Sequence, residues 1–332
     1  MKKKYHISIS ISDTAFRYVV VDRDQNGFFV PAYGETFLEE GIVVKGEIIK
    51  ASALLDVITS FKKNLPDSSV SIYSLVLPHQ YFIHDSFLVA GVSSQKQKNS
   101  AIQQYLGDNI QQYPWAENHS CLYQTDEHDM VYVEALPHER YQSYITLLSS
   151  CGIDNVEVHS DISAVSVMVK DSPSVVIKID NEKSYVFEIN NGFVESKKTF
   201  ELSYQSLVSD VVKFLGVDLD FARKVVRKYG VSRAHQEPKV YQRIVRSVSP
   251  LLDYLKVNKS TRKKKIYLWF SHEPLVGMKD VLTKQMHTEI NVISPVHNEI
   301  VLYHEVLDIH MDDTYRYSAL LLTASLSMNG KL

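Results

Sequence analysis

Glycine is scarce in this chain: the sequence has 12 glycines in 332 residues, about half of the usual frequency. No two of them are closer than five residues, which excludes the G-x-G-x-x-G loops that bind phosphate in dinucleotide-binding proteins and kinases. Gly41 and Gly46 have the outer spacing of a P-loop, but Glu47 stands where that motif requires lysine. Because a carboxylate repels phosphate, we exclude this reading as well.

Cysteine, excess charge and long apolar runs are also lacking. Cys121 and Cys151 are the two cysteines, too few for a disulfide framework or a zinc site and typical of a reducing cytosol. A formal charge of −3 lacks the basic footprint of a nucleic-acid-binding protein. No apolar run approaches the ~18 residues of a membrane-spanning helix. We therefore expect a cytoplasmic protein that binds no nucleic acid.

Catalytic and metal-binding motifs are not found. His304-Glu305 and His310 resemble a zincin motif, but six residues separate the histidines, which do not converge on one helical face as four would. The acidic stretch Asp126–Asp129 is interpreted as a solvated hairpin tip, with a bound cation as the less favoured alternative. No nucleophile elbow or cysteine–histidine pairing is recognisable. We expect no metal and no catalytic residue.

Two similar groups of strands indicate an internal duplication. Each group consists of two strands, an Asn-Gly hairpin turn and a third strand. The strands are predicted at Tyr5–Ser12, Phe16–Val21 and Phe28–Tyr33, and again at Ser174–Ile179, Tyr185–Ile189 and Phe193–Phe200. This repetition predicts a duplicated α/β fold.

The segments between and after these groups are richer in helix. Helices are predicted at Ala51–Lys63, 94–113 and His138–Ser150, with a strand at Val70–Leu77. Such helices beside short antiparallel strands are typical of a small α+β subdomain. In the second half, apolar residues follow 3-4 spacing; they are Tyr241, Ile244, Val248, Leu251 and Leu255. We interpret them as a core-facing helix surface rather than a coiled-coil seam, because only two heptads are present.

Several short motifs, in order, resemble a known family. Gly41–Ile49 resembles its G-x-I-x-x-G-x-I segment before the first helix. Leu77-Pro78, followed by an extended segment and a helix ending near Tyr113-Pro114, resembles its inserted subdomain. Val131–Pro137, followed by a helix and Cys151-Gly152-Ile153, resembles the passage that closes its inserted subdomain. Together they resemble the actin-like PilM family of type IV pilus assembly, which is related to FtsA.

The resemblance implies a fold and its division. The fold is the actin-like ATPase fold, a two-lobe α/β fold with a duplicated ribonuclease-H-like core and an inserted SHS2-like α+β subdomain. The first lobe would hold 1–35, 151–172 and 311–332, with 36–150 as the insertion. The second would hold 173–201 and 265–310, with 202–264 as a helical insert.

In actin-like proteins three loops hold a nucleotide, and here all three are altered. In the first, Ser10 replaces the carboxylate that organises Mg²⁺, Ser12 replaces a glycine, and Asp13 places a negative charge where phosphate would lie. In the second, Lys178 and Asp180 replace the carboxylate and the glycine.

In the third loop Phe270 and His272 add side chains where only bare backbone leaves room for a nucleotide. The resemblance thus implies a degenerate cleft formed by Ser10, Ser12, Asp13, Thr14, Arg17, Lys178, Asp180, Asn181, Phe270, Ser271 and His272. We expect no ATP or Mg²⁺ cofactor and no hydrolysis, with Lys178 in a salt bridge to Asp13 or Asp180. The alternative is an ATP-binding switch or ATPase in which Lys178 and Arg17 grip phosphate without metal.

The function implied by the resemblance is that of a cytoplasmic scaffold. It would bind the cytoplasmic N-terminal tail of a PilN-like inner-membrane protein, in a groove that Ile42, Val44 and Ile48 border. Self-association is a further expectation, and membrane contact would come mainly through the partner. The basic runs Lys2–Lys4 and Arg262–Lys265 are the candidates for direct lipid contact, although a solvated connection is the more ordinary reading.

Overall fold

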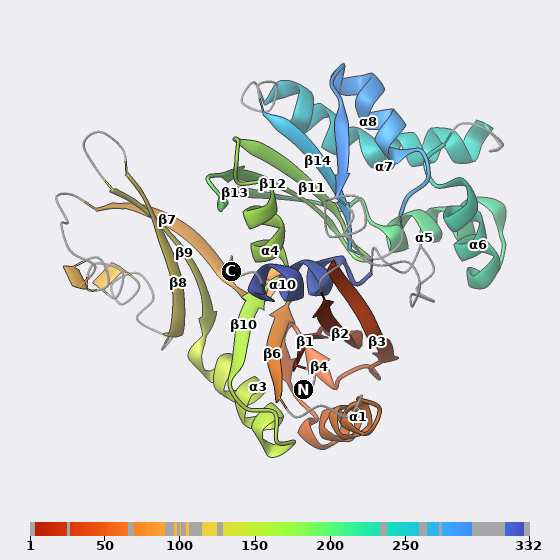
Figure 1. Cartoon of the computed structure of the whole chain (residues 1–332). Coiled ribbons are helices and arrows are strands. Elements are labelled where there is room, and N and C mark those ends of the chain that lie inside the picture. Colours follow the sequence, from red (N-terminus) through yellow and green to blue (C-terminus); the bar gives the residue numbers. More distant parts are fainter. Residues whose placement is uncertain are drawn as a thin grey trace. The chain divides into compact units, whose positions relative to one another are not determined.

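A computed structural model of the chain describes residues 4–24, 27–65, 70–89, 96–97, 100, 104–105, 115–124, 129–232, 238–258, 264–271, 274–293 and 316–328. These residues form two compact units. The first holds the described residues up to Met168 and from Ala319 onward, and the second holds those from Val169 to Ser318. Each unit is built around one five-stranded sheet (Figure 1).

The sheet of the first unit has the strand order β10-β6-β1-β2-β3. Its strands are β1 (Lys4–Ile11), β2 (Ala15–Asp24), β3 (Gly27–Phe37), β6 (Val70–Leu77) and β10 (Val156–Ser160). The central strand β1 runs antiparallel to β2 and parallel to β6. Its alternating sequence sends Ile7 and Ile9 to one face and His6 and Ser8 to the other, and all four are buried.

Two helices cover the isoleucine face of this sheet. Helix α1 (Ala51–Lys63) buries Leu54 and Ile58 in the same cluster as Ile7 and Ile9. Helix α3 (His138–Ser150) adds Tyr144 and Leu148 to that cluster. Both helices have the bounds predicted from their apolar spacing. A short hairpin of β4 (Val43–Val44) and β5 (Glu47–Ile48) precedes α1.

A separate antiparallel sheet follows, with the order β7-β9-β8. It consists of β7 (Ile83–Val89), β8 (Trp115–Gln124) and β9 (Asp129–Pro137), and the 3-10 turn His79–Tyr81 leads into it. The expected start of the insertion at residue 36 is therefore too early in the chain. Strand β6 pairs with β1 from Lys4↔Val70 to Ser10↔Val76 and also with β10, so Val70–Leu77 belongs to the main sheet and not to the insertion.

The sheet of the second unit repeats the first. Its order is β13-β12-β11-β14-β15, and its strands are β11 (Ser174–Ile179), β12 (Ser184–Asn190), β13 (Phe193–Phe200), β14 (Lys265–Phe270) and β15 (Ile290–Ile293). Strand β11 is antiparallel to β12 and parallel to β14, as β1 is to β2 and β6. The predicted duplication is confirmed.

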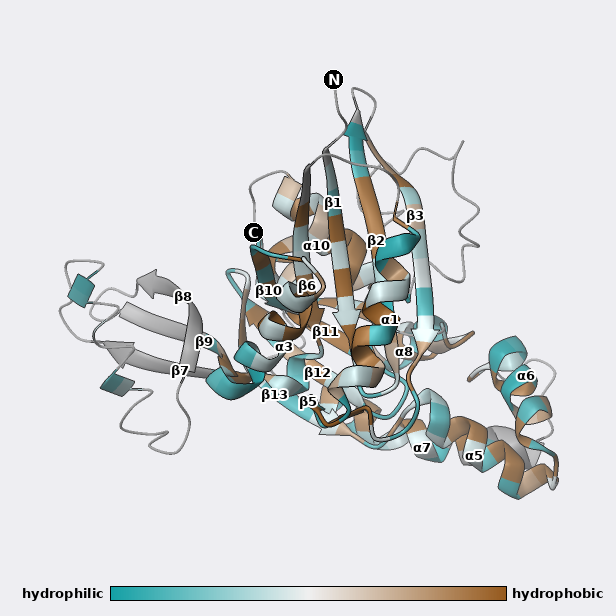
Figure 2. Ribbon diagram, turned by 90° about the horizontal axis from the view of Figure 1, so that it is seen from below, coloured by the Kyte–Doolittle hydropathy of each residue, from teal (hydrophilic) through white to brown (hydrophobic). Residues whose placement is uncertain are grey.

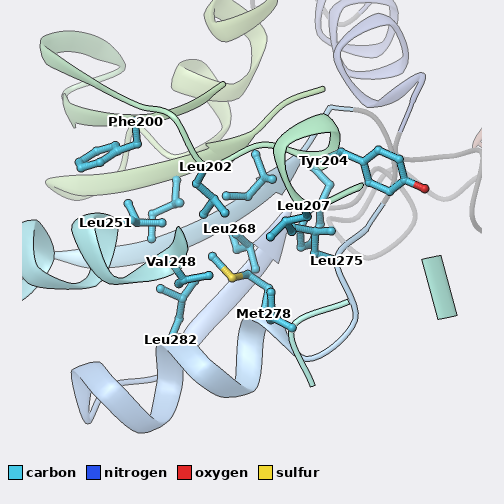
Figure 3. Close-up of a cluster of buried hydrophobic side chains, with 14 of the residues drawn as sticks. Phe200, Leu202, Tyr204, Leu207, Val248, Leu251, Leu268, Leu275, Met278 and Leu282 are labelled. Atoms are coloured by element: carbon cyan, nitrogen blue, oxygen red, sulfur yellow. The ribbon is translucent and has the colours of Figure 1, made fainter. Parts of the chain in front are cut away.

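Four of the described helices contribute buried side chains to the core of the second unit. They are α5 (Tyr204–Leu215), α6 (Leu219–Tyr229), α7 (Pro238–Val257) and α8 (Met278–Met286). Residues Val248 and Leu251 of α7 meet Met278 and Leu282 of α8 over Leu268 in one buried cluster (Figure 3). The apolar spacing in α7 is thus a core-facing surface, as predicted; the side chain of Tyr241 lies outside the described residues.

The remaining described helices are α4 (Asp161–Met168) and α10 (Ser318–Met328). No helix among the described residues has the length and apolar character needed to cross a membrane. Most of the helix expected at 94–113 and nearly all of the acidic tip at Asp126–Asp129 lie outside the described residues, as do His304 and His310.

Candidate functional site

The turn between β1 and β2 is closed by its own serine. The backbone N–H of Ser12 donates to the carbonyl of Ala15 at 3.0 Å. The hydroxyl oxygen of Ser12 accepts from the N–H groups of Ala15 at 3.1 Å and Thr14 at 3.4 Å. A phosphate at this turn would need those same N–H groups. The serine found in place of the expected glycine therefore satisfies the donors that a nucleotide would use.

The carboxylate of Asp13 binds the hairpin that follows. It accepts hydrogen bonds from the backbone N–H of Lys45 at 2.8 Å and of Gly46 at 3.0 Å. Both residues have positive φ, 50° for Lys45 and 78° for Gly46, so their N–H groups point into one concavity of the kind that binds anions. Asp13 supplies the anion itself, and the hairpin is held against the β1–β2 turn.

Tyr81 completes this clamp. Its hydroxyl donates to the Asp13 carboxylate, and its ring covers Gly46, where a Cβ would lie 2.6 Å from the ring. Burial, together with the hydrogen bond to Asp13, raises the pKa of Tyr81 well above its usual value, so the hydroxyl stays protonated and remains a donor.

Helix α3 holds the same hairpin from another side. The hydroxyl of Tyr144 donates to the carbonyl of Gly46 at 3.2 Å, and burial raises the pKa of Tyr144 above its usual range. Arg140 donates to the carbonyl of Tyr81 at 2.9 Å, lies over its ring, and approaches Glu47 at 3.7 Å. We call Asp13, Tyr81, Arg140 and Tyr144 together with the turn at Lys45 and Gly46 the hairpin clamp.

The three residues expected to border a partner groove differ in exposure. Ile42 is 4% exposed and belongs to the core of the first unit, so its side chain is not available at the surface. Val44 is 43% exposed, and Ile48 is partly buried against the core. Ile49, which the sequence reasoning did not select, is 58% exposed. The apolar surface of this hairpin therefore consists mainly of Val44 and Ile49.

The other expected residues of the first unit lie on strands. Ser10 is half-buried on β1, opposite Arg17 on β2. The Nε atom of Arg17 lies 2.6 Å from Glu35 Oε1 on β3, and both side chains are largely buried. The cation proposed to grip phosphate is thus neutralised by a carboxylate within its own sheet.

In the second unit, Lys178 is fully enclosed. Its side chain is 1% exposed, and its Nζ atom lies 3.0 Å from Asp180 Oδ2. The register of β11 places Lys178 between Tyr185 of β12 and Trp269 of β14. Its Nζ atom lies 5.8 Å from the tyrosine ring centroid and 4.9 Å from the tryptophan ring centroid, and both contacts favour a cation. Of the two partners predicted for Lys178, Asp13 or Asp180, the structure shows Asp180.

The loop after β11 caps helix α5. The carbonyls of Asp180 and Asn181 accept from the N–H groups of Tyr204 at 3.3 Å and Gln205 at 3.0 Å. Ser203 caps the helix and accepts from the N–H of Ser206 at 2.9 Å. Because a helix N-terminus binds phosphate through such free N–H groups, this end of α5 is already satisfied by protein atoms.

The third loop differs from expectation. Phe270 is buried in the hydrophobic core with Ile266 and Leu268, so the expectation that its ring would crowd a nucleotide is wrong. The alternation of β14 turns Trp269 to the opposite face, where its Nε1 donates to Ser318 Oγ at 2.8 Å. The N–H of Ser271 donates to the carbonyl of Ile179 at 3.2 Å, and His272 lies outside the described residues.

Neither a protein-family model nor a curated protein matches this sequence. Among solved structures, a PilM–PilN type IV pilus biogenesis complex matches with a TM-score of 0.72 at 15% identity, over 98% of each chain. The fold is actin-like. MreB5 of Spiroplasma citri bound to AMPPNP matches with a TM-score of 0.59 at 9% identity, over 100% of this chain and 98% of that one. Its ADP-bound form gives 0.57 at 10% identity, over 99% and 97%.

At these identities the likeness concerns the fold, and the actin-like architecture expected from the order of motifs is confirmed. Across the described residues of this actin-like chain, no group of three or more His, Cys, Asp or Glu side chains is placed to hold a metal ion. The site contacts that sequence reasoning missed come from Tyr81, Arg140, Tyr144, Tyr185 and Trp269. The first four lie outside the three nucleotide-loop motifs. Trp269 begins the segment matched to the third loop, and only the register of β11 with β12 and β14 places Tyr185 and Trp269 beside Lys178.

Proposed function

We propose that this chain is a non-hydrolysing adaptor of a type IV pilus or related secretion machine, which binds the cytoplasmic tail of a PilN-like inner-membrane protein. The observation that carries the proposal is the hairpin clamp, in which a carboxylate occupies the anion-binding concavity formed by Lys45 and Gly46. The solved structure with the highest TM-score given above is of a PilM–PilN complex.

The same contacts disfavour ATP chemistry. A nucleotide phosphate would face the Asp13 charge and find the N–H groups of Thr14 and Ala15 already bonded to Ser12. Ser10 offers a neutral hydroxyl where Mg²⁺-bound water needs a carboxylate. Lys178 and Arg17 each have a carboxylate partner within their own unit.

The hairpin at residues 43–48 is the proposed tail-binding element. Its turn is fixed by two hydrogen bonds to Asp13 and one from Tyr144, so it costs little conformational entropy to present Val44 and the adjoining Ile49 to a partner. A short extended tail binds well to such a rigid apolar edge, through backbone hydrogen bonds and alternate apolar side chains.

The nucleotide half of the proposal is tested by thermal unfolding with and without millimolar Mg²⁺-ATP. A ligand that binds only the folded state raises the midpoint by mass action, and we expect no rise. A clear rise that disappears in Lys178→Ala would instead favour the ATP-binding alternative.

The adaptor half is tested by pull-down with synthetic N-terminal tails of inner-membrane proteins encoded beside this gene. We expect one tail to be retained, and Val44→Asp with Ile49→Asp to lose it. Val257→Asp is the matched control, because Val257 is an exposed apolar residue of the other unit. Retention that survives the hairpin variant would move the binding site elsewhere, and self-association without any tail binding would favour a filament-forming protein.

A further inference from the structure

The turn between helices α5 and α6 exposes an unusual amount of apolar surface. Phe214, Leu219 and Phe221 are each 50% exposed, and Leu215 is 41% exposed. All four lie within eight consecutive residues, at the last turn of α5 and the first turn of α6. We call these four residues the apolar tip.

The apolar tip is rigid. Gly216, with φ of 63°, ends α5 in the left-handed conformation, and its N–H donates to the carbonyl of Val212 at 2.9 Å. Asp218 then caps α6 by accepting from the N–H of Phe221 at 2.7 Å. Beneath it, Val211 and Ala222 are buried in the core of the second unit. The exposed rings therefore project from a fixed helical corner.

Basic side chains continue from the apolar tip along α6. Exposed lysines and arginines follow on this stretch; they are Lys213, Arg223, Lys224, Arg227 and Lys228. Asp218 and Asp220 are the acidic residues among them, one a cap and the other 3.3 Å from Arg223. The stretch is thus clearly basic, although the whole chain carries a formal charge of −3. In Figure 2 the ribbon of α6 alternates between hydrophilic and hydrophobic residues, next to the largely hydrophobic ribbon of α5.

Helix geometry keeps these charges close to the apolar tip. Phe221, Lys224 and Lys228 are spaced three and four residues apart, so they lie along one side of α6. At 1.5 Å per residue, Lys228 is only about 10 Å along the axis from Phe221. That distance is comparable to the Debye length of about 8 Å at physiological salt, so a surface touching the tip also feels the charges.

We propose that the apolar tip and its basic flank dock the second unit directly onto an anionic phospholipid surface. Phenylalanine and leucine beside lysine and arginine are the residues that anchor proteins in the headgroup region of such membranes. Three of the five basic residues are lysines, which protein–protein interfaces disfavour and anionic lipid surfaces accept. The charge complementarity therefore favours lipid over a protein partner.

In the basic run Arg262–Lys265, one of the two predicted to contact lipid, Lys264 is less suited to that role. The Nζ atom of Lys264 lies 2.7 Å from Glu188 and 3.9 Å from Glu195, so its charge is balanced within the fold. Arg262 and Lys263 lie outside the described residues, as do Lys2 and Lys3. Lipid docking by the apolar tip is independent of the proposed tail-binding partner, because it needs only this chain and a membrane.

The test is vesicle co-sedimentation of the purified full chain, without any partner protein. The probes are vesicles of phosphatidylcholine alone and of phosphatidylcholine with phosphatidylglycerol. We expect binding to the anionic vesicles only, weakened by added salt. Lys224→Glu with Lys228→Glu should weaken binding by about tenfold or more, since each basic residue near the surface contributes about one kcal/mol. Separately, Phe214→Ser with Phe221→Ser should weaken it by about tenfold or more, because two rings no longer bury apolar area in the headgroup region.

Val257→Ser is the matched control, because this exposed valine lies at the end of α7, away in sequence from the tip. It should leave binding unchanged, and the thermal midpoints should show that the charge variant remains folded. Absence of binding to anionic vesicles, equal binding to neutral vesicles, or binding that survives both variants would each overturn the proposal. A solution dimer that Phe214→Ser with Phe221→Ser dissociates, without vesicle binding, would make the tip a contact between copies instead.

Discussion

The two units share one sheet topology, but the side chain that stabilises the loop after the central strand is an anion, Asp13, in the first unit and a cation, Lys178, in the second. Beyond β1, the carboxylate of Asp13 accepts from backbone N–H groups of a neighbouring hairpin. At the end of β11, the ammonium of Lys178 is paired with Asp180 and enclosed by two aromatic rings. The comparison shows that the two equivalent loops of a duplicated fold can be stabilised by different chemistry. One is held by a carboxylate that accepts backbone hydrogen bonds, and the other by a buried lysine–aspartate pair.

The buried cation should give the largest effect. Asp180→Asn leaves Lys178 buried without its carboxylate, and breaking such a pair from one side costs on the order of 3 kcal/mol of unfolding free energy. We expect that loss in urea denaturation followed by circular dichroism.

The matched variant is Lys178→Met, which removes the charge while keeping most of the side-chain volume between Tyr185 and Trp269. It should destabilise by less than Asp180→Asn, because Asp180 is 34% exposed and can be solvated. The double variant should therefore be more stable than Asp180→Asn alone. If the two losses simply add, the enclosed charge is not the cause.

In the first unit, the face of β1 that carries His6 and Ser8 should make the stability of the fold sensitive to acid. His6 is buried there, hydrogen-bonded through Nε2 to Ser74, and burial lowers its pKa from 6.5 to about 4. Because the unfolded chain binds the proton first, stability should fall as pH drops from 6.5 towards 4, by about 3 kcal/mol in total. The measurement is the free energy of unfolding against pH.

A control separates His6 from its neighbours. His159, whose Nε2 atom lies 3.7 Å from Glu157 Oε2, lowers the pKa of Glu157, so this carboxylate also loses stabilising contacts in acid, below its ordinary value of 4.5. His6→Asn should remove most of the pH dependence of the unfolding free energy between pH 6.5 and 4.5. The loss of stability below pH 4.5, which comes from Glu157 and other carboxylates, should remain. An unchanged profile would exclude His6 as the titrating group.

Much of the fold could be predicted from local patterns. Local sequence patterns predicted α1 and α3, and the repeated group of strands around an Asn-Gly turn predicted β11 and β13, with the bounds found in the structure. The start of the insertion could not be predicted this way, because the pairing of β6 with β1 joins residues far apart in the sequence. The order of the motifs predicted the actin-like fold, but it did not predict which groups Asp13 and Lys178 contact.

The candidate site was only half predictable. Asp13 and Lys178 were selected because they are the wrong residues for a nucleotide loop, yet the hairpin that Asp13 binds is set by tertiary packing of Tyr81 and Tyr144. The prediction that the Phe270 ring would lie in the nucleotide cleft took no account of the alternation of side chains along β14. Because alternate residues of a strand share a face, Phe270 lies on the core face with Ile266 and Leu268, and Trp269 is the residue on the opposite face.

The hairpin clamp should give an intermediate effect. Asp13→Ala removes the acceptor for two backbone N–H groups and one phenol, and hydrogen bonds to charged groups contribute about 1.5–3 kcal/mol. Since this turn is only half-buried and water can replace the carboxylate, we expect a loss of about 2 kcal/mol in urea denaturation.

Asp13→Asn tests the role of charge at the same position. It keeps one acceptor oxygen but loses the charge, and should cost less than Asp13→Ala. Binding of a tail peptide to the hairpin should weaken in parallel with stability across the two variants. Full tail affinity in Asp13→Ala would mean that the clamp stabilises the fold without shaping the partner surface.

The smallest effect is expected at Lys45, and its sign is informative. Lys45 is an exposed residue with φ of 50°, a conformation that costs a side chain about 1 kcal/mol and costs glycine almost nothing. Lys45→Gly keeps the N–H that Asp13 accepts, so the variant should gain about 0.5 kcal/mol after the added freedom of the unfolded chain is counted. Lys224→Gly, at an exposed lysine in the middle of α6, lacks this relief and should lose up to about 1 kcal/mol instead. A gain in stability for Lys45→Gly would mean that the native turn accepts backbone strain so that two successive N–H groups can converge on the Asp13 carboxylate. The loop of the second unit has no such requirement, because its buried charge is a lysine that pairs with a side chain.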